Sequence, residues 1–255
     1  EALDVTRDSC PHLFYSLPAQ DGLIHSYNTS CSGGVQQHSL AVLQQAAELL
    51  QQDLPVAIPT ETVYGLAANA LSAPAVAHIF KAKGRPSDNP LIVHVSDLDM
   101  LHKLYPDHMA AGTNPIPPQY HRLIAAFWPG PLTILLPASP LIPAAVTAGQ
   151  STVAVRMPAH PVARALIAAA GVPLAAPSAN TSGRPSPTTA QHVLEDLIGR
   201  IPAVVDGGAC GVGVESTVLD GLRVPPVVLR PGGVTAEQLA ESPEMEGLQV
   251  GYCMQ

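Results

Sequence analysis

The feature that most constrains the fold is a series of short apolar runs that alternate with helix-like segments and end at proline, glycine or polar residues. Runs this short, bounded by chain breakers, are typical of buried strands. The expected strands are 54–58, 90–95, 132–136, 152–156, 173–176, 203–206, 214–219 and 227–230. This alternation predicts an α/β fold with a twisted, mixed sheet flanked by helices.

Helices are expected between these runs, where capping residues precede apolar positions at helical spacing. Helices are expected to start at Ser39, at Ser72, after Asp97 and at Thr235, and the one from Ser72 is expected to end near Lys83. Further helices are expected over 123–127, over 161–170 and from Thr188 to Ile198. The apolar face of the first is Leu40, Leu43, Ala47 and Leu50. Residues 105–118, rich in Pro, Gly and Asn, are expected to form a surface loop.

The chain is interpreted as one domain, because no shift in composition divides residues 35–240. Residues 1–34 are expected to be a partly irregular N-terminal extension and 241–255 a C-terminal tail. No apolar run reaches the roughly 18 residues that a membrane span needs, so no membrane contact is expected. A cytoplasmic location is expected, and targeting to an organelle stays open because the chain does not begin with Met.

The charge pattern favours a small anionic ligand over a nucleic acid. The net charge is −8, and aromatic residues make up only 4% of the chain. These values disfavour a broad cationic surface and base stacking. Of the twelve Lys and Arg residues, however, six fall in motif-like stretches, namely Lys81, Lys83, Arg85, Arg156, Arg184 and Arg230. A focused cationic patch can act inside an acidic protein.

Several familiar sites are excluded by their missing motifs. The four cysteines, Cys10, Cys31, Cys210 and Cys253, form no CxxC pair and are interpreted as free thiols in a reducing compartment, a disulfide being the less favoured alternative. The sequence has no HExxH, no Walker A lysine after Gly211–Thr217 and no GxGxxG at the start of a helix. No protein-bound metal is therefore expected.

The stretch Pro-Thr-Glu-Thr-Val-Tyr-Gly-Leu at 59–66 follows the strand at 54–58. Pro59 ends that strand because it has no N–H to donate. Open α/β sheets bind ligands beyond the carboxyl ends of their strands, so this hydroxyl-rich loop is expected to face one. Lys83 and Arg85, around Gly84, could hold phosphates as a point charge and a bidentate fork, although such a turn is more often solvated surface.

Further polar residues end the other apolar runs. Ser178 and Asn180 follow 173–176 and could either face a ligand or form a turn or helix cap. Arg156 ends 152–156, and its buried charge needs a ligand anion or an internal acid as its partner. His94 lies within 90–95 and is by default a core histidine. These residues alone indicate an α/β protein with a polar, cationic cavity for a small molecule that carries phosphate.

Eight stretches resemble, in this order, the YrdC/Sua5 family of threonylcarbamoyl-AMP synthases, and the resemblance covers roughly residues 38–240. They are PTETVYGL (59–66), KGRPSDNPLIVHV (83–95), WPGPLT (128–133), TVAVRMPAHP (152–161), APSANTSGRPSPT (176–188), VDGG (205–208), GVESTV (213–218) and VLRPGG (228–233). The resemblance implies a reaction in which L-threonine, bicarbonate or CO2, and ATP give threonylcarbamoyl-adenylate and pyrophosphate. A partner enzyme would then transfer the threonylcarbamoyl group to tRNA, with weak binding of tRNA or double-stranded RNA by this chain as a further expectation.

The resemblance also implies roles for particular residues. ATP would contact Lys83, Arg85, Asn89, Thr152, Ser178, Asn180, Ser186 and Arg230. Threonine would contact Thr60 or Thr62, His94, Arg156, the backbone of Ala176 and Ser216. Mg²⁺ is expected on the ATP phosphates. No general base is identified; Glu61 is the tempting candidate, but the sequence does not place its side chain.

Two departures from the family and two competing functions remain. The longer branch of the family adds a linker and a second domain, whereas this chain ends at Gln255, which favours a single-domain form or a truncated chain. Residues 1–34 match nothing in the family pattern. The competing functions are a non-catalytic RNA-binding or ribosome-maturation module and a relative that uses carbamoyl phosphate.

Overall fold

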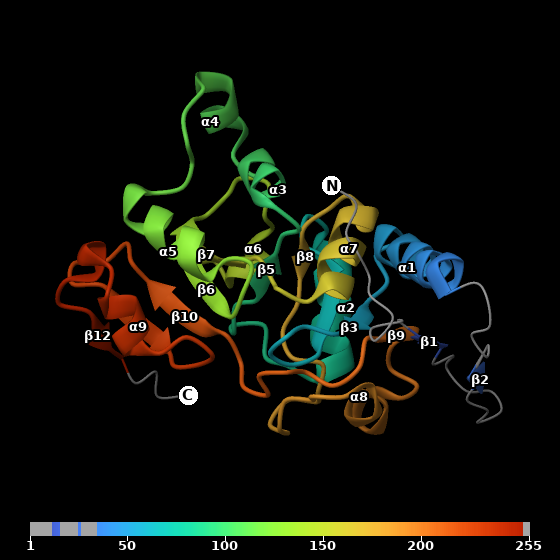
Figure 1. Cartoon of the computed structure of the whole chain (residues 1–255). Helices are drawn as coiled ribbons and strands as arrows, with labels where there is room; N and C mark the ends of the chain where they lie inside the picture. Colours follow the sequence, from blue (N-terminus) through green and yellow to red (C-terminus); the bar gives the residue numbers. More distant parts are fainter. Residues whose placement is uncertain (1–11, 16–24, 27–34, 252–255) are drawn as a thin grey trace.

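The computed structural model describes residues 12–15, 25–26 and 35–251 (Figure 1). The expectations for Cys10, Cys31, Cys253 and most of residues 1–34 lie outside these ranges. The described strands are β1 His12–Tyr15, β2 His25–Ser26, β3 Val56–Ile58, β4 Gly65–Asn69, β5 Ile92–His94, β6 Leu132–Pro137, β7 Thr152–Arg156, β8 Leu174–Ala175, β9 Ala203–Asp206, β10 Thr217–Asp220, β11 Val227–Arg230 and β12 Gln249–Val250.

These strands form one mixed sheet, in the order β12-β11-β10-β6-β7-β5-β8-β4-β3-β9-β1-β2. The pairs β5–β7, β6–β10 and β3–β9 are parallel, whereas β8 runs antiparallel to both of its neighbours, β4 and β5. The predicted single-domain α/β fold with a mixed sheet and flanking helices is confirmed.

Helices cover both faces of the sheet. They are α1 Val35–Gln51, α2 Ala73–Lys83, α3 Leu98–Lys103, α4 Pro106–Ala111, α5 His121–Phe127, α6 Ala144–Thr147, α7 Pro161–Ala170, α8 Ala190–Leu197 and α9 Ala236–Ala240, with short 3-10 turns at Pro118–Tyr120 and Pro243–Met245. In Figure 1, α1 and α7 lie side by side, whereas α3 and α4 project from the body.

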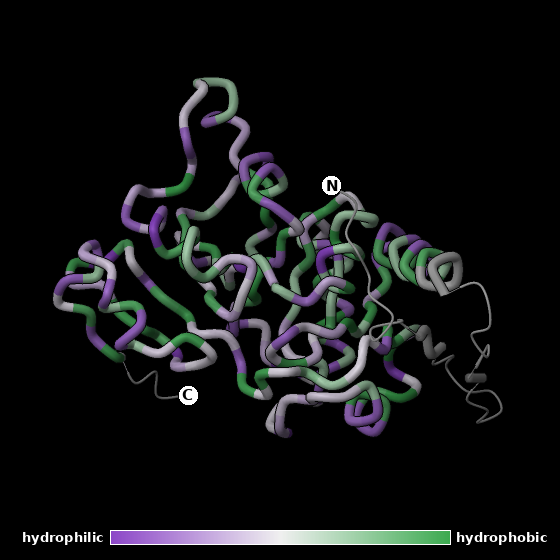
Figure 2. The backbone as a smooth tube through the Cα atoms, viewed as in Figure 1, coloured by the Kyte–Doolittle hydropathy of each residue, from purple (hydrophilic) through white to green (hydrophobic). Residues whose placement is uncertain are grey.

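The core has two apolar layers because successive residues of a strand point to opposite faces. Along β4, Leu66 and Ala68 pack in the cluster that contains Val76 and Ile79 of α2. Ala67, between them, packs in the cluster formed with α1 and α7. Figure 2 shows the same amphipathic pattern on α1, where purple and green positions alternate around the helix.

The predicted helix ends are largely confirmed, since they depend on local capping chemistry. The side chains of Ser72, Asp97 and Thr235 each accept a hydrogen bond from a backbone N–H in the first turn of the helix that follows. Gly84 and Gly171 end α2 and α7 with φ of 61° and 71°, the left-handed conformation that glycine adopts without strain.

The predictions for three helical segments are partly wrong. Helix α1 begins at Val35 rather than after Ser39, and Leu40 is 65% exposed because α7 packs on the face that carries Leu43 and Leu50. The cap of α8 is Thr189 rather than Thr188, and that helix ends at Leu197. Within the predicted surface loop 105–118, residues Pro106–Ala111 form α4, while Tyr105 and Ile116 are buried.

Two segments extend the sheet in ways the sequence did not indicate. The loop after Pro59 ends at Tyr64, because Gly65 already begins β4 and pairs with Ile58. Beyond residue 240, β12 pairs with β11, and Met245 is fully buried in the core. The sheet and core therefore continue past residue 240 to the end of the described chain. No helix among the described residues is long and apolar enough to cross a membrane.

Candidate functional site

The loop between β3 and β4 is held by the hydroxyls of Thr60 and Thr62, both of which are buried. The Thr60 hydroxyl donates to the carbonyl of Val63 at 2.7 Å and accepts from the backbone N–H groups of Thr62 and Val63. Its oxygen lies 2.8 Å from that of Thr62. This side-chain turn gives the loop one defined conformation, from which Thr62 reaches the end of β7.

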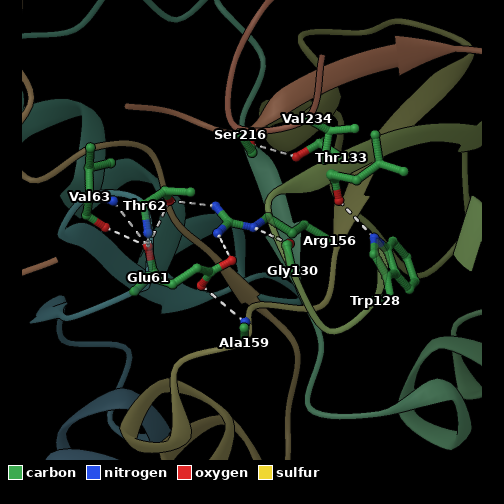
Figure 3. Close-up of polar contacts among 12 residues, drawn as sticks. Glu61, Thr62, Val63, Trp128, Gly130, Thr133, Arg156, Ala159, Ser216 and Val234 are labelled. Carbon is green, nitrogen blue, oxygen red and sulfur yellow. Dashed lines mark hydrogen bonds and ion pairs between the residues drawn. The ribbon is translucent and has the colours of Figure 1, made fainter. Parts of the chain in front are cut away.

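Arg156, the last residue of β7, is the centre of this region (Figure 3). Its Nη1 donates to Oγ1 of Thr62 at 2.9 Å, its Nε donates to the carbonyl of Gly130 at 3.1 Å, and its Nη2 lies 2.5 Å from Oε1 of Glu61. The residue is 3% exposed. Burial lowers the pKa of the Arg156 guanidinium, and the Glu61 carboxylate opposes that shift.

Glu61 supplies the internal acid that the sequence left as one of two alternatives for Arg156. Its other carboxylate oxygen accepts from the backbone N–H of Ala159 at 3.0 Å, so both oxygens are used. A guanidinium has five N–H donors. The three contacts of Arg156 leave one N–H on each terminal nitrogen without a partner among the described residues. That pair of donors could bind a further carboxylate.

A second group of polar contacts surrounds Ser216, just before β10. The Ser216 hydroxyl lies 2.8 Å from that of Thr133, and its carbonyl accepts from Nη2 of Arg230 at 2.8 Å. Nη1 of Arg230 pairs with Oε2 of Glu215 at 2.6 Å, and the Ser186 hydroxyl donates to Oε1 of Glu215 at 2.9 Å. Two expected ATP-side residues thus meet at one carboxylate.

Lys83, at the end of α2, is buried and reaches the turn after β8. Its Nζ donates to the carbonyls of Ser178 and Asn180, the latter at 2.6 Å. Burial and, next, repulsion from Arg85 lower the pKa of Lys83 to about 8. The structure therefore brings Lys83, Ser178 and Asn180 together. Lys83 contacts the backbone carbonyl of Ser178 rather than its hydroxyl.

Arg85, Asn89 and Thr152 lie near the amino-terminal ends of β5 and β7. Arg85 donates from Nε to the carbonyl of Asn89 at 3.4 Å and from Nη2 to that of Pro90 at 3.2 Å. The parallel register of β5 and β7 pairs Ile92 with Ala154. Thr152 and Pro90 each lie two residues before this pair, so Thr152 lies toward the same edge as Arg85.

The cations of these groups interact with one another. Besides burial, repulsion from Arg85 lowers the pKa of Lys83, repulsion from Arg230 lowers that of Arg85, and repulsion from Arg156 lowers that of Arg230. Glu215 opposes the shift at Lys83, Arg85 and Arg230. Like charges held close together favour binding of an anion, which would relieve their repulsion.

His94 and Ala176 complete the expected threonine side. His94 pairs with Arg156 across the β5–β7 ladder, and its Nδ1 lies 3.2 Å from the carbonyl of Ile92. Burial and the nearby Arg156 lower the pKa of His94 to about 3, so the ring is neutral. The backbone N–H of Ala176 donates to the carbonyl of Ile92 at 2.9 Å. His94 is thus a buried, hydrogen-bonded core histidine that adjoins the site.

The expected site residues follow the carboxyl ends of strands that run in opposite directions. His94 and Arg156 end the parallel strands β5 and β7 at one end of the sheet, but β8 is antiparallel to β5. Ser178, after β8, therefore lies beside Gly65 at the start of β4. The groups are brought together by the 59–64 loop and by long side chains rather than by a common strand edge.

Sequence reasoning missed the roles of two acids, Glu61 and Glu215. Each immediately precedes or follows an expected site residue, and each pairs with an expected ligand-binding arginine. The available signal was an arginine at the end of an apolar run, as at Arg156 and Arg230, because a charge at the end of a buried strand needs a counter-charge. Among the described residues, no group of three or more His, Cys, Asp or Glu could hold a metal ion.

Fold and site together define an α/β protein with two adjoining cationic regions, one around Arg156 and one around Lys83, Arg85 and Arg230. The profile of the Sua5/YciO/YrdC family, described as telomere recombination, matches residues 48–232. The chain belongs to this family.

Similar proteins agree with this assignment. The chain is 56% identical to a threonylcarbamoyl-AMP synthase of Schizosaccharomyces pombe over 79% of this chain and 53% of that protein. It is 38% identical to a threonylcarbamoyl-AMP synthase of Halorhodospira halophila over 70% of this chain and 90% of that protein. The chain thus spans about half the length of the yeast relative and nearly all of the bacterial one.

Solved structures share the fold. P. abyssi Sua5, in a crystal structure described as complexed with L-threonine, superposes with a TM-score of 0.76 at 47% identity, covering 83% of this chain and 59% of that one. E. coli YciO superposes with a TM-score of 0.68 over 78% of this chain and 93% of that one. At 22% identity, the second likeness concerns the fold alone.

Proposed function

We propose that this chain is an L-threonylcarbamoyladenylate synthase, which forms threonylcarbamoyl-AMP and pyrophosphate from L-threonine, bicarbonate or CO2, and ATP. The observation that carries the proposal is the adjoining pair of cationic regions: Nη2 of Arg230, on the expected ATP side, donates to the hydroxyl of Ser216, on the expected threonine side, at 3.1 Å. A reaction that joins an amino acid to a nucleotide needs two anion-binding regions side by side. The names of the relatives and the threonine complex of P. abyssi Sua5 support the same function.

On the threonine side, Arg156 would bind the substrate carboxylate. Its Nε, Nη1 and Nη2 each already make a contact that fixes the guanidinium plane, and two further N–H groups remain for a ligand. Thr62 and Ser216 would contact the amino acid around it, and the neutral His94 would close this side without adding charge. The role of this region is to position the amino acid.

On the ATP side, Lys83, Arg85 and Arg230 would offset the charge of the phosphates, with Ser178, Asn180, Ser186, Asn89 and Thr152 around the nucleotide. Lys83 is anchored by two backbone carbonyls rather than by a carboxylate, so its positive charge is available to a phosphate. Mg²⁺ would enter with ATP and neutralise phosphate charge. With no carboxylate cluster among the described residues, it would be held mainly by phosphate oxygens and water.

The expected chemistry needs positioning more than acid–base groups. The neutral amine of threonine takes up CO2 to form a carbamate and releases one proton to solvent. A carbamate oxygen then attacks the α-phosphorus of ATP. The bond from that phosphorus to the bridging oxygen breaks, and pyrophosphate leaves. Lys83, Arg85 and Arg230 would stabilise charge that develops on the phosphates, as in other phosphoryl-group chemistry. Transfer of the product to tRNA by a partner enzyme, and weak tRNA binding, belong to the same proposal.

The test is incubation of the chain with ATP, bicarbonate and labelled threonine, followed by chromatography for the labelled adenylate and assay of pyrophosphate. The proposal predicts both products in equal amounts, and loss of both when any one substrate is omitted. Product from carbamoyl phosphate but not from threonine would contradict it in favour of a carbamoyl-phosphate enzyme. Salt-sensitive tRNA binding without turnover on either substrate would contradict it in favour of an RNA-binding module.

A further inference from the structure

Glu215 is a carboxylate placed among cations of the nucleotide side. Its two oxygens contact Arg230 Nη1 at 2.6 Å and the Ser186 hydroxyl at 2.9 Å. It also attracts Lys83 and Arg85 electrostatically. An acid in this position raises the question of what it does when phosphates are present, since it carries the same charge as they do.

The contacts of Glu215 occupy donors that a phosphate would need. Ser186 and Arg230 are both expected at the ATP side, and a phosphate group binds through the same hydroxyl and guanidinium donors. Glu215 and a phosphate oxygen therefore compete for these donors. A protein whose binding-competent form is only a fraction of the population binds its ligand more weakly by that fraction.

The exposure of Glu215 differs from that of Glu61, the other acid of the site. The side chains of Glu215 and Arg230 are 34% and 37% exposed, whereas those of Glu61 and Arg156 are 16% and 4% exposed. Glu61 is further anchored to a backbone N–H. A partly exposed ion pair costs little free energy to break, whereas breaking a buried one costs much more. A ligand can therefore displace Glu215 from Arg230 more easily than it can displace Glu61 from Arg156.

We infer that Glu215 is a displaceable counter-anion: it occupies Arg230 and Ser186 while the phosphate region is empty, and it yields them to the phosphates of ATP. This inference rests on the proposed function. Without a ligand, Glu215 limits the repulsion between the cations. Once pyrophosphate has formed, Glu215 competes with it for the same donors, which lowers the affinity of the site for that product and promotes its release.

The experiment measures binding of inorganic pyrophosphate to the full chain by calorimetry, without threonine or turnover. Glu215→Gln removes the charge but keeps a side chain of the same size, and it is expected to bind pyrophosphate about tenfold more tightly, the order of effect for removal of one like charge in partly exposed surroundings. The matched control is Glu244→Gln. Glu244 is 32% exposed and pairs with Arg122, outside the site, so pyrophosphate affinity should not change.

Glu215→Asp provides a second readout because it keeps the charge but shortens the side chain. The inference predicts an affinity between those of the parent chain and Glu215→Gln. If Glu215 were instead a scaffold that orients Arg230, both variants would bind pyrophosphate more weakly, which would overturn the inference. Unchanged affinity in Glu215→Gln would overturn it as well. Failure of the parent chain to make the adenylate would contradict only the proposed function, because pyrophosphate binding is measured without turnover.

Discussion

Replacing Glu61 with glutamine tests the buried ion pair on which the arrangement of Arg156 depends. The variant removes the charge that faces Nη2 of Arg156 at 2.5 Å and weakens the contact with the N–H of Ala159. Arg156 would remain buried and would still donate hydrogen bonds to Thr62 and Gly130, but it would have no counter-charge. A buried charge without its partner is costly, so the folded state should lose stability.

The magnitude follows from the burial of the two partners. Breaking a fully buried ion pair costs about 3–5 kcal/mol. The glutamine amide keeps a neutral hydrogen bond worth about 1 kcal/mol, so the expected loss in the free energy of unfolding is about 2–4 kcal/mol. With a urea slope of about 2–3 kcal/mol per molar, this is a shift in midpoint of roughly 1 M.

The assay is urea unfolding followed by circular dichroism, with Glu48→Gln on the exposed face of α1 as the matched control. The control should change stability by no more than about 0.5 kcal/mol, as surface substitutions do. If Glu61→Gln also changed stability by less than this, the reasoning about the buried pair would be refuted. In the folded variant, the KM for threonine should rise while that for ATP stays near the parent value, because only Arg156 loses a fixed orientation.

Two further predictions concern Lys83 and Gly232. The pKa of Lys83 is about 8 in the folded chain and ordinarily 10.5. Between pH 8 and pH 10.5 the unfolded chain therefore binds more protons at this residue than the folded chain does, so Lys83 makes the free energy of unfolding rise with pH. Pyrophosphate should raise the pKa of Lys83, so its binding at pH 8.5 should be accompanied by uptake of a proton. This uptake is measured by calorimetry in buffers of different ionisation enthalpy. Lys83→Met should abolish the uptake, whereas Lys81→Met, at an exposed position, should not. In Gly232→Ala the new Cβ would lie 2.3 Å from the carbonyl oxygen of Glu215, so we expect a loss of about 2 kcal/mol or more in unfolding free energy. Gly211→Ala, which meets nothing within 4 Å, is its control, and equal stability of the two variants would contradict this expectation.

Local chemistry made much of the fold predictable. The caps at Ser72, Asp97 and Thr235 lie within three residues of the N–H groups they bind, so a short window of sequence contains all the information needed. The alternation of strands and helices is similarly local. Helix α4 was missed even though Pro106 stands at its first turn, a position that proline favours, because the surrounding Pro, Gly and Asn residues indicate a loop.

Contacts between distant segments could not be predicted from the sequence alone. The sequence named Glu61 but could not orient it, since its partner Arg156 is 95 residues away along the chain. The strand β4 begins within the predicted loop because Gly65 pairs with Ile58 in antiparallel register, which depends on tertiary packing. Similarly, Leu40 has the right spacing for the apolar face of α1, but the position of α7 decides which face is buried.

The division of the site into a threonine side and an ATP side is tested most directly by steady-state kinetics of Arg156→Ala and Lys83→Ala with both substrates varied. The account predicts that Arg156→Ala raises the KM for threonine more than that for ATP, and that Lys83→Ala does the reverse, because their charges lie in different regions. Equal increases for both substrates in both variants would contradict it.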